Sequence, residues 1–267
     1  DHIGEVVNLA INQYITAEMH IDDERRISVR YSSDVPIGSG LGTSAAMNVA
    51  FLSAIAGDGK SPDEIAELAF QFEALLGNTG GRQDQWASAY GGFQHLRFVG
   101  DKVISKQLNP SSKFIEDLER NLLLFDSGIT HVSGDLHDSV WQRYANGDKD
   151  IPEALRRIRH MAQEMVVAIE SENIPGVGIS LFRTTKSVDL LDKAFDEPFR
   201  RVLKPLWGDY IFGWKAMGAG AGGVVGVMLE DEGCRSEVMA VAEKNGWKHI
   251  DWAVEQQGIQ RTVNLHE

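Results

Sequence analysis

A glycine-rich stretch at residues 36–46, Pro-Ile-Gly-Ser-Gly-Leu-Gly-Thr-Ser-Ala-Ala, has the residue types and the spacing that phosphate binding needs. Its closely spaced glycines let the backbone turn tightly and approach a ligand without a Cβ clash. Thr43 and Ser44 then open an Ala-rich segment that we expect to be helical. The first amides of a helix lack intrahelical acceptors and lie at the positive end of its dipole, so they bind phosphate well. The residues alone leave a second interpretation open, in which a glycine turn simply caps the helix.

This stretch lacks the signatures of two other nucleotide-binding loops. No Gly-Lys-Ser/Thr follows it, which excludes a P-loop. A dinucleotide-binding turn needs a preceding strand and an acidic residue about twenty positions later, whereas residues 57–60 have the composition of a loop. We therefore do not expect a nicotinamide cofactor.

Two carboxylates form a second candidate group. Glu73 lies near the end of an expected amphipathic helix, and Asp84 follows a glycine turn at residues 80–81. Asp84 is placed to accept a hydroxyl proton or to orient an alcohol. Glu73 is suited to Mg²⁺, which takes one or two protein oxygens and completes its shell with phosphate and water. A solvated glutamate and a turn-forming aspartate are the simpler alternative.

A third glycine-rich stretch, residues 215–223, leads into the apolar residues 224–229. Glycine before a buried strand indicates either close packing or a close approach of the backbone to a ligand.

The three stretches, together and in this order, resemble the GHMP kinases. Residues 36–46 resemble the phosphate loop of that family, with Thr43 where a serine is usual, and residues 218–223 resemble its C-terminal glycine-rich motif, with Ala221 where glycine is common. The resemblance implies that Ser44 and Glu73 hold Mg²⁺ and that Asp84 is the catalytic base. The residues that it assigns to ATP are Pro36, Gly38, Ser39, Gly40, Leu41, Gly42, Thr43, Ser44, Ala45, Gly218, Ala219 and Gly220.

Within this family, residues 80–87 and 90–93 look most like the kinases for D-glycero-D-manno-heptose 7-phosphate and for L-fucose. Residues 127–131 resemble a Thr-Gly-X-Thr/Ser-Arg segment of those kinases, with His131 in place of the arginine. The resemblance implies an ATP-dependent phosphotransferase that acts on a hydroxyl of a sugar or sugar phosphate, with ATP and Mg²⁺ as cofactors. A kinase of a cyclitol or other small alcohol, a diphosphate decarboxylase on the same fold and a silent regulator remain alternatives. The family's first motif would precede Asp1, so we expect a chain that lacks its natural start.

The expected fold is the two-lobed α+β architecture of the GHMP kinases. Residues 1–110 are predicted to form a lobe like domain 2 of ribosomal protein S5, and residues 111–267 a ferredoxin-like α+β lobe. Turn residues at 109–112 mark the boundary. Strands are expected at residues 6–18, 27–31, 92–98, 103–108, 121–125, 224–229, 252–254 and 260–264, and helices at 43–55, 62–76, 151–171 and 237–245.

Composition narrows the range of partners. The 267 residues are 43% hydrophobic and carry a formal net charge of −13, which makes nucleic acid an improbable partner. The single cysteine, Cys234, excludes an intrachain disulfide. No apolar run reaches the length of a membrane span. We expect a cytoplasmic protein whose partner is a small sugar or sugar-like alcohol, and we leave a homodimer open.

Aromatic and histidine residues outside these motifs have simpler explanations. Trp207, Trp214 and Trp252 are expected in the core rather than stacked on a ligand. His131 and His137 are expected at solvated positions, with contact to an anionic substrate as the alternative.

Overall fold

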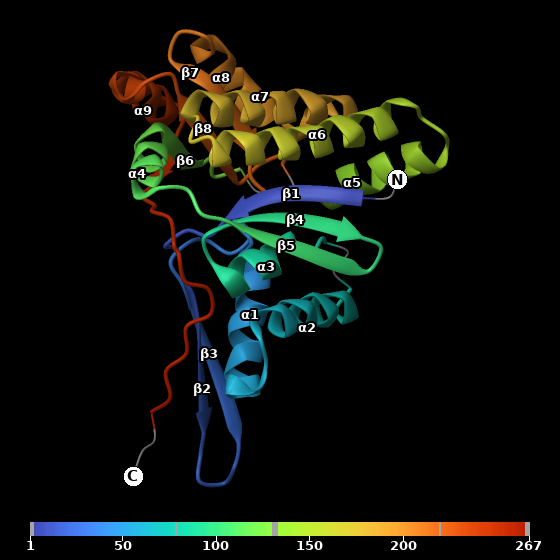
Figure 1. Ribbon diagram of the computed structural model, residues 1–267, viewed down its shortest axis with the longest axis vertical. Helices are drawn as coiled ribbons and strands as arrows, with labels where there is room; N and C mark the ends of the chain where they lie inside the picture. Colours follow the sequence, from blue (N-terminus) through green and yellow to red (C-terminus); the bar gives the residue numbers. More distant parts are fainter. Residues whose placement is uncertain (1–2, 78–79, 130–132, 219, 265–267) are drawn as a thin grey trace. The chain divides into compact units, whose positions relative to one another are not determined.

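The computed structural model describes residues 3–77, 80–129, 133–218 and 220–264, and it contains both helices and strands (Figure 1). The strands are β1 (Ile3–Leu9), β2 (Ile15–Ile21), β3 (Ile27–Ser33), β4 (Phe93–Val99), β5 (Lys102–Leu108), β6 (Leu122–Asp126), β7 (Ile211–Ala216), β8 (Val224–Leu229) and β9 (Lys248–Ile250). The α-helices are α1 (Thr43–Ala56), α2 (Pro62–Leu75), α3 (Gln83–Tyr90), α4 (Ser112–Asn121), α5 (Ser133–Ala145), α6 (Asp150–Glu170), α7 (Ile174–Leu191), α8 (Glu197–Leu203) and α9 (Arg235–Lys244). Within the described residues, the strands form sheets of order β1-β4-β5, β2-β3 and β7-β8-β6-β9.

The chain divides into two compact units that each combine segments distant in sequence. One unit, which we call the sheet unit, contains residues 1–7, 38–41 and 95–252. The other, which we call the hairpin unit, contains residues 8–37, 42–94 and 253–267. The predicted boundary between residues 110 and 111 stays a prediction.

The hairpin unit contains an antiparallel hairpin and the helices α1, α2 and α3 (Figure 1). Strands β2 and β3 pair from Ile15 opposite Ser33 to Ile21 opposite Ile27. Helix α1 packs against β2, α2 and α3 and therefore lies at the centre of this unit.

The start of α2 shows how local sequence sets an element. Ser61 and Glu64 form a capping box, in which the Glu64 carboxylate accepts the Ser61 backbone N–H at 3.0 Å. The buried residues Ile65, Ala69 and Glu73 then recur every four positions and define the face that packs inward. The helix start predicted at residues 61–64 is confirmed, and the helix points Glu73 into the unit.

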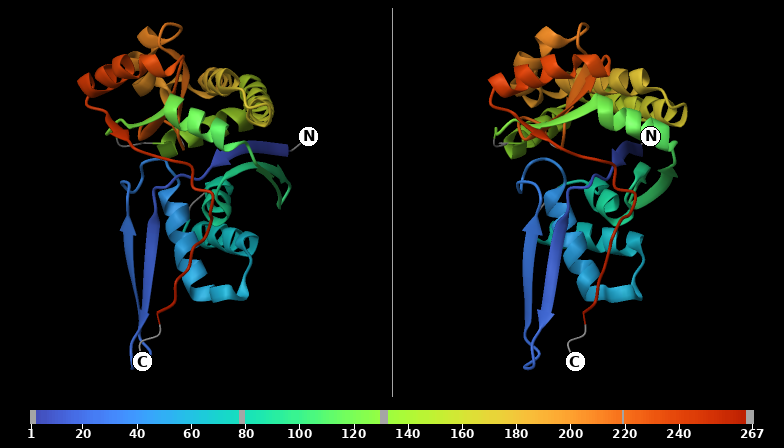
Figure 2. Two further views of the ribbon diagram at one scale, coloured as in Figure 1. Left: turned by 60° about the vertical axis from the view of Figure 1, so that its left-hand side comes forward. Right: turned by 90° about the vertical axis from the view of Figure 1, so that its left-hand side faces the viewer.

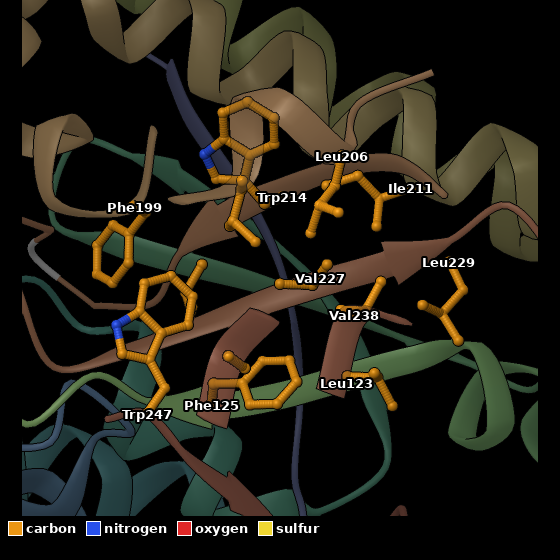
Figure 3. Close-up of a cluster of buried hydrophobic side chains, with 13 residues drawn as sticks. Leu123, Phe125, Phe199, Leu206, Ile211, Trp214, Val227, Leu229, Val238 and Trp247 are labelled. Atoms are coloured by element: carbon orange, nitrogen blue, oxygen red, sulfur yellow. The ribbon is translucent and has the colours of Figure 1, made fainter. Parts of the chain in front are cut away.

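The sheet unit is built around the antiparallel sheet β7-β8-β6-β9. All six residues of β8 are buried, as expected for a central strand between β7 and β6. A cluster of buried side chains lies on this sheet, where Trp214, Phe125 and Trp247 gather with the aliphatic side chains of β6 and β8 (Figure 3). The long helices α6 and α7 pack against each other, and α7 also packs against β7.

Three of the predicted strands are wrong. Residues 6–18 form two strands rather than one, because the chain leaves its pairing in the β1-β4-β5 sheet and joins β3 through β2. Residues 251–264, all of them described, form no strand although two were predicted there. The segment runs extended instead (Figure 2, red) and is held by single backbone bonds, such as those between Asn12 N–H and Ala253 O and between Glu255 N–H and Ala10 O, both at 2.9 Å.

Other elements escaped the sequence analysis. Helices α3, α4, α5, α7 and α8 were not predicted. Trp214 and Trp252 are buried as predicted, whereas Trp207 is half exposed and stacks on Phe182 with ring centroids 4.5 Å apart. In the described part of the chain, every helix falls short of the length or apolar character that crossing a bilayer requires.

Candidate active site

The phosphate loop, residues 36–46, ends at the N-terminus of α1 in the hairpin unit. Gly42 is the N-cap residue and has a φ of 73°, a conformation that favours glycine. Because glycine has no side chain, it cannot cap the helix, and this end of α1 stays suited to an anionic ligand. Thr43 and Ala45 are buried, while Ser44 is exposed and faces solvent.

Asp84 lies directly against this loop. It occupies the first turn of α3, where the helix dipole favours a carboxylate. A Cβ atom built on Gly42 would lie 3.0 Å from Cβ and 3.1 Å from Cγ of Asp84. The structure therefore brings the predicted phosphate loop and the predicted catalytic carboxylate together. From the sequence, Asp84 was expected to follow a glycine turn, and the short helix was missed because its buried face is only Gln85, Trp86 and Ala89.

Glu73 is nearly buried and joins the three helices of the hairpin unit. Its side chain is 6% exposed. Asn48 Nδ2 on α1 donates to one carboxylate oxygen at 2.8 Å, and Gln85 Nε2 on α3 donates to the other at 3.0 Å. Asn48 lies one helical turn after Ser44, so Glu73 reaches the same face of α1 as that hydroxyl. Neither Asn48 nor Gln85 was predicted as a site residue, although Asn48 lies one helical turn after Ser44 and Gln85 directly follows Asp84.

The donor set around Glu73 fits a hard cation. The Gln85 side-chain oxygen is buried and has no hydrogen-bond partner among the described residues. The carboxylate oxygens of Glu73 and the side-chain oxygen of Gln85 are ligands of the kind that Mg²⁺ prefers. No cluster of three His, Cys, Asp or Glu side chains occurs in the described residues, which is compatible with an ion that relies on phosphate and water. The assignment of Ser44 and Glu73 to Mg²⁺ stays a prediction.

The middle of the phosphate loop, residues 38–41, belongs to the sheet unit and contacts the glycine-rich turn at residues 218–223, which we call the glycine loop. A Cβ atom on Gly218 would lie only 2.7 Å from the Gly40 carbonyl oxygen, so the two backbones touch. Val224 N–H donates to Ser39 O at 2.9 Å and anchors the phosphate loop to the start of β8. The Ser39 hydroxyl is buried and has no partner among the described residues, which suits a site completed by a ligand.

The glycine loop also contacts residues 127–129, which belong to the segment that resembles the Thr-Gly-X-Thr/Ser-Arg segment of the sugar kinases. Gly223 N–H donates to Ile129 O at 2.9 Å, and the Ser127 hydroxyl donates to Gly223 O at 2.7 Å. Thr130, His131 and Ala219 lie outside the described residues. His137 is exposed, as predicted, and its ring lies 5.2 Å from that of Phe195.

The predicted site residues thus form one group in each unit. Pro36, Gly42, Thr43, Ser44, Ala45, Glu73 and Asp84 belong to the hairpin unit, and Gly38, Ser39, Gly40, Leu41, Gly218 and Gly220 belong to the sheet unit. Pro36 and Gly38 are exposed, and Leu41 is half-buried. The individual roles of these residues stay predictions.

Comparison with known proteins identifies the N-terminal part of the chain. Residues 5–92 match the family described as GHMP kinases N terminal domain. D-glycero-alpha-D-manno-heptose 7-phosphate kinase of Campylobacter jejuni is 28% identical over 239 residues, which cover 87% of this chain and 70% of that protein. Bifunctional fucokinase/GDP-fucose pyrophosphorylase of Arabidopsis thaliana is 28% identical over 78% of this chain, which spans only 20% of its length. The structure of a D-glycero-D-manno-heptose 1-phosphate kinase from Bacteriodes thetaiotaomicron has the same fold, with a TM-score of 0.72 at 20% identity over 96% of this chain and 89% of that one.

Proposed function

Because this chain carries the N-terminal domain of the GHMP kinases, we propose that it transfers the γ-phosphoryl group of ATP to a hydroxyl of a sugar or sugar phosphate. The observation that carries the proposal is the contact between Asp84 and Gly42 at the N-terminus of α1. A carboxylate beside an anion-binding helix terminus is where an alcohol can lose its proton while it attacks a phosphate.

Phosphoryl transfer depends mainly on positioning and on neutralising charge. The backbone amides of the phosphate loop orient the phosphates of ATP. The carboxylate of Asp84 accepts the hydroxyl proton of the sugar. Ser44 and Glu73 would hold Mg²⁺, and the ion supplies positive charge beside the phosphate oxygens when it is bound. Asn48 and Gln85 keep the Glu73 carboxylate in one orientation through their hydrogen bonds.

The substrate class follows from the relatives and from the loop at residues 127–129. Heptose 7-phosphate kinase and fucokinase are the names of the two relatives above, which supports a heptose phosphate or a fucose-like sugar as the acceptor. The hydrogen bonds of Ser127 and Ile129 to Gly223 place that segment on the glycine loop, where it would contact an acceptor beside the nucleotide.

The proposal is tested by ATP turnover with a panel of acceptors. The panel holds heptose 7-phosphate, fucose, other hexoses, a cyclitol and mevalonate, and the products are identified by ³¹P and ¹H NMR. We expect ADP formation together with a new phosphate ester on one sugar. ATP binding without transfer to any acceptor, or transfer to the cyclitol or mevalonate alone, would overturn the sugar kinase proposal.

A further inference from the structure

The glycine loop contacts Phe195, which has no role in the proposed reaction. Ala221 N–H donates to the carbonyl oxygen of Phe195 at 2.7 Å. A Cβ atom on Gly220 would lie 3.1 Å from the same oxygen. Ala221 has a φ of 63°, which is strained for a residue with a side chain. Strain of this kind persists only where neighbouring contacts impose it, so the position of Phe195 fixes the shape of the glycine loop.

Phe195 is followed by Asp196, a carboxylate buried among hydrogen-bond donors. The Asp196 side chain is 2% exposed. One oxygen accepts the indole N–H of Trp214 at 2.8 Å, and the other accepts from Arg200 Nη2 at 3.0 Å. Trp214 belongs to the buried cluster of the sheet unit (Figure 3). Asp196 therefore ties the chain beside the glycine loop to the buried cluster of that unit.

The network around Asp196 requires a charged carboxylate. Arg200 of α8 and Asp189 of α7 face it and form an ion pair with each other. Further out, Glu197 Oε2 lies 3.5 Å from Arg200 Nη1, and Lys186 Nζ lies 3.7 Å from Asp189 Oδ2. Both Asp196 oxygens face donors, so a proton on either one would weaken the hydrogen bond at that oxygen. Burial raises the pKa of Asp196 to about 6, although the hydrogen bond from Trp214 and the charge of Arg200 act in the opposite direction.

We propose that Asp196 is a positioning residue that holds the glycine loop against the phosphate loop, and that it does so only in its ionised form. The coupling runs through described contacts of the sheet unit: Asp196 fixes Phe195, Phe195 fixes Ala221 and Gly220, and Gly218 touches Gly40. The proposal rests on the proposed function, because it takes the two loops as parts of the ATP site. Its consequence is that ATP affinity falls as the pH drops through 6.

Asp196→Asn tests the proposal, because an amide has nearly the shape of the carboxylate but presents N–H groups to Arg200. The dissociation constant of Mg-ATP is measured by titration calorimetry from pH 5 to pH 8. At pH 7.5 we expect the variant to bind on the order of two- to thirtyfold more weakly than the unaltered protein, the range over which residues between coupled sites act. At pH 5 the two constants should converge, because Asp196 is then protonated in the unaltered protein. The turnover number at saturating ATP should change little.

Trp252→Phe is the matched control. Trp252 is also a buried tryptophan of the sheet unit, but its indole N–H donates to Leu122 O at 3.0 Å, away from the glycine loop. This variant should lose stability and keep the ATP affinity and pH profile of the unaltered protein. If Asp196→Asn does not fold, Trp214→Phe keeps a ring in the cluster and removes one of the two donors, so it should weaken ATP binding at pH 7.5 in the same way.

The outcomes separate this inference from the proposed function. If the unaltered protein does not bind Mg-ATP, the proposed function fails. If it binds Mg-ATP but Asp196→Asn binds equally well at pH 7.5, or if the ratio of the two constants is the same at pH 5 and pH 7.5, the positioning role of Asp196 is overturned.

Discussion

The two groups of predicted site residues are built in different ways. In the hairpin unit the chemistry lies in side chains, since Asp84 contacts Gly42 and Glu73 is held by Asn48 and Gln85. In the sheet unit the contacts are made by backbone, since Gly218 touches Gly40 and Ala221 binds Phe195. We therefore propose that the first group decides what reaction is possible, and that the second decides the shape of the loops that would meet the phosphates. Variants that change side-chain chemistry should lower turnover, whereas variants that change backbone shape should lower affinity.

Asp84→Asn should have the largest effect of these variants, a loss of turnover. Its carboxylate is proposed to accept the hydroxyl proton, a contribution that is typically worth about 10²–10⁴-fold in rate. ATP affinity should stay nearly unchanged, because Asp84 acts on the alcohol and not on the phosphates. Steady-state turnover and calorimetric ATP binding measure the two quantities. Asp23→Asn, in the exposed turn of the β2-β3 hairpin, removes the same charge and should leave both unaltered. Full turnover in Asp84→Asn would remove this residue from the mechanism.

Gly218→Ala tests the backbone group. Its φ is 59°, and the added Cβ would lie 2.7 Å from the Gly40 carbonyl oxygen, so the two loops must separate. ATP affinity should fall about tenfold or more, since a separation of loops costs at least the roughly 1–3 kcal/mol of a strained backbone position. Gly208→Ala is the matched control, because Gly208 has a φ of 89° but an added Cβ meets no described atom within 4 Å. Equal loss of ATP affinity in both variants would show that strain, and not the contact with Gly40, is responsible.

Ser44→Ala and Glu73→Gln test the metal assignment within the side-chain group. If both residues hold one Mg²⁺, each variant should lower the Mg²⁺-dependent turnover, and the double variant should lose less than the sum. Raised Mg²⁺ should partly rescue each single variant. Asn48→Ala is the control for a purely structural role of Glu73. It should lower the free energy of unfolding by about 1–3 kcal/mol, because it deprives a buried carboxylate of a donor, and it should raise the Mg²⁺ requirement less than Glu73→Gln does, because the carboxylate itself remains. Strictly additive losses of turnover in the double variant would contradict the assignment of Ser44 and Glu73 to Mg²⁺.

Ala221→Gly should have the smallest effect on ATP affinity, and it should raise the free energy of unfolding. Glycine tolerates the φ of 63° that Ala221 adopts, so the variant should gain up to about 1 kcal/mol in the free energy of unfolding. The same change loosens the glycine loop, and ATP affinity should fall slightly. Chemical denaturation and calorimetry give the two values. A loss of stability would mean that the side chain of Ala221 contributes packing that outweighs its strain.

The family and the class of enzyme were predictable from the sequence because motifs fix them locally. The GHMP resemblance, the α+β class and the small-molecule kinase assignment are confirmed by the matched domain and the kinase relatives. The helix after Ser61 and the buried strand β8 are also set by nearby residues, through a capping box and a continuous apolar run.

What the sequence did not predict depends on distant partners. Helix α3 has a polar first turn and few apolar residues, so its buried Gln85 becomes meaningful only once Glu73 lies beside it. Residues 251–264 contain apolar residues that suggest strands, but their backbone bonds go to single residues far away in sequence. The Asp196 network likewise joins α7, α8 and β7, which no spacing in the sequence relates.

The extended segment at the end of the described chain has a consequence for how the protein folds. Its Ala253 N–H bonds to the side chain of Asn12 across a separation of 241 residues, and Ile259 N–H bonds to Ala89 at the end of α3. During synthesis, α3, which carries Asp84, is made early. Ile259, whose N–H donates to the backbone of α3, is made only after nearly the whole sheet unit. Contacts of such long sequence separation slow folding, and a nascent chain keeps them open until late. We therefore expect the proposed catalytic group to become fully ordered last, after translation has passed residue 259.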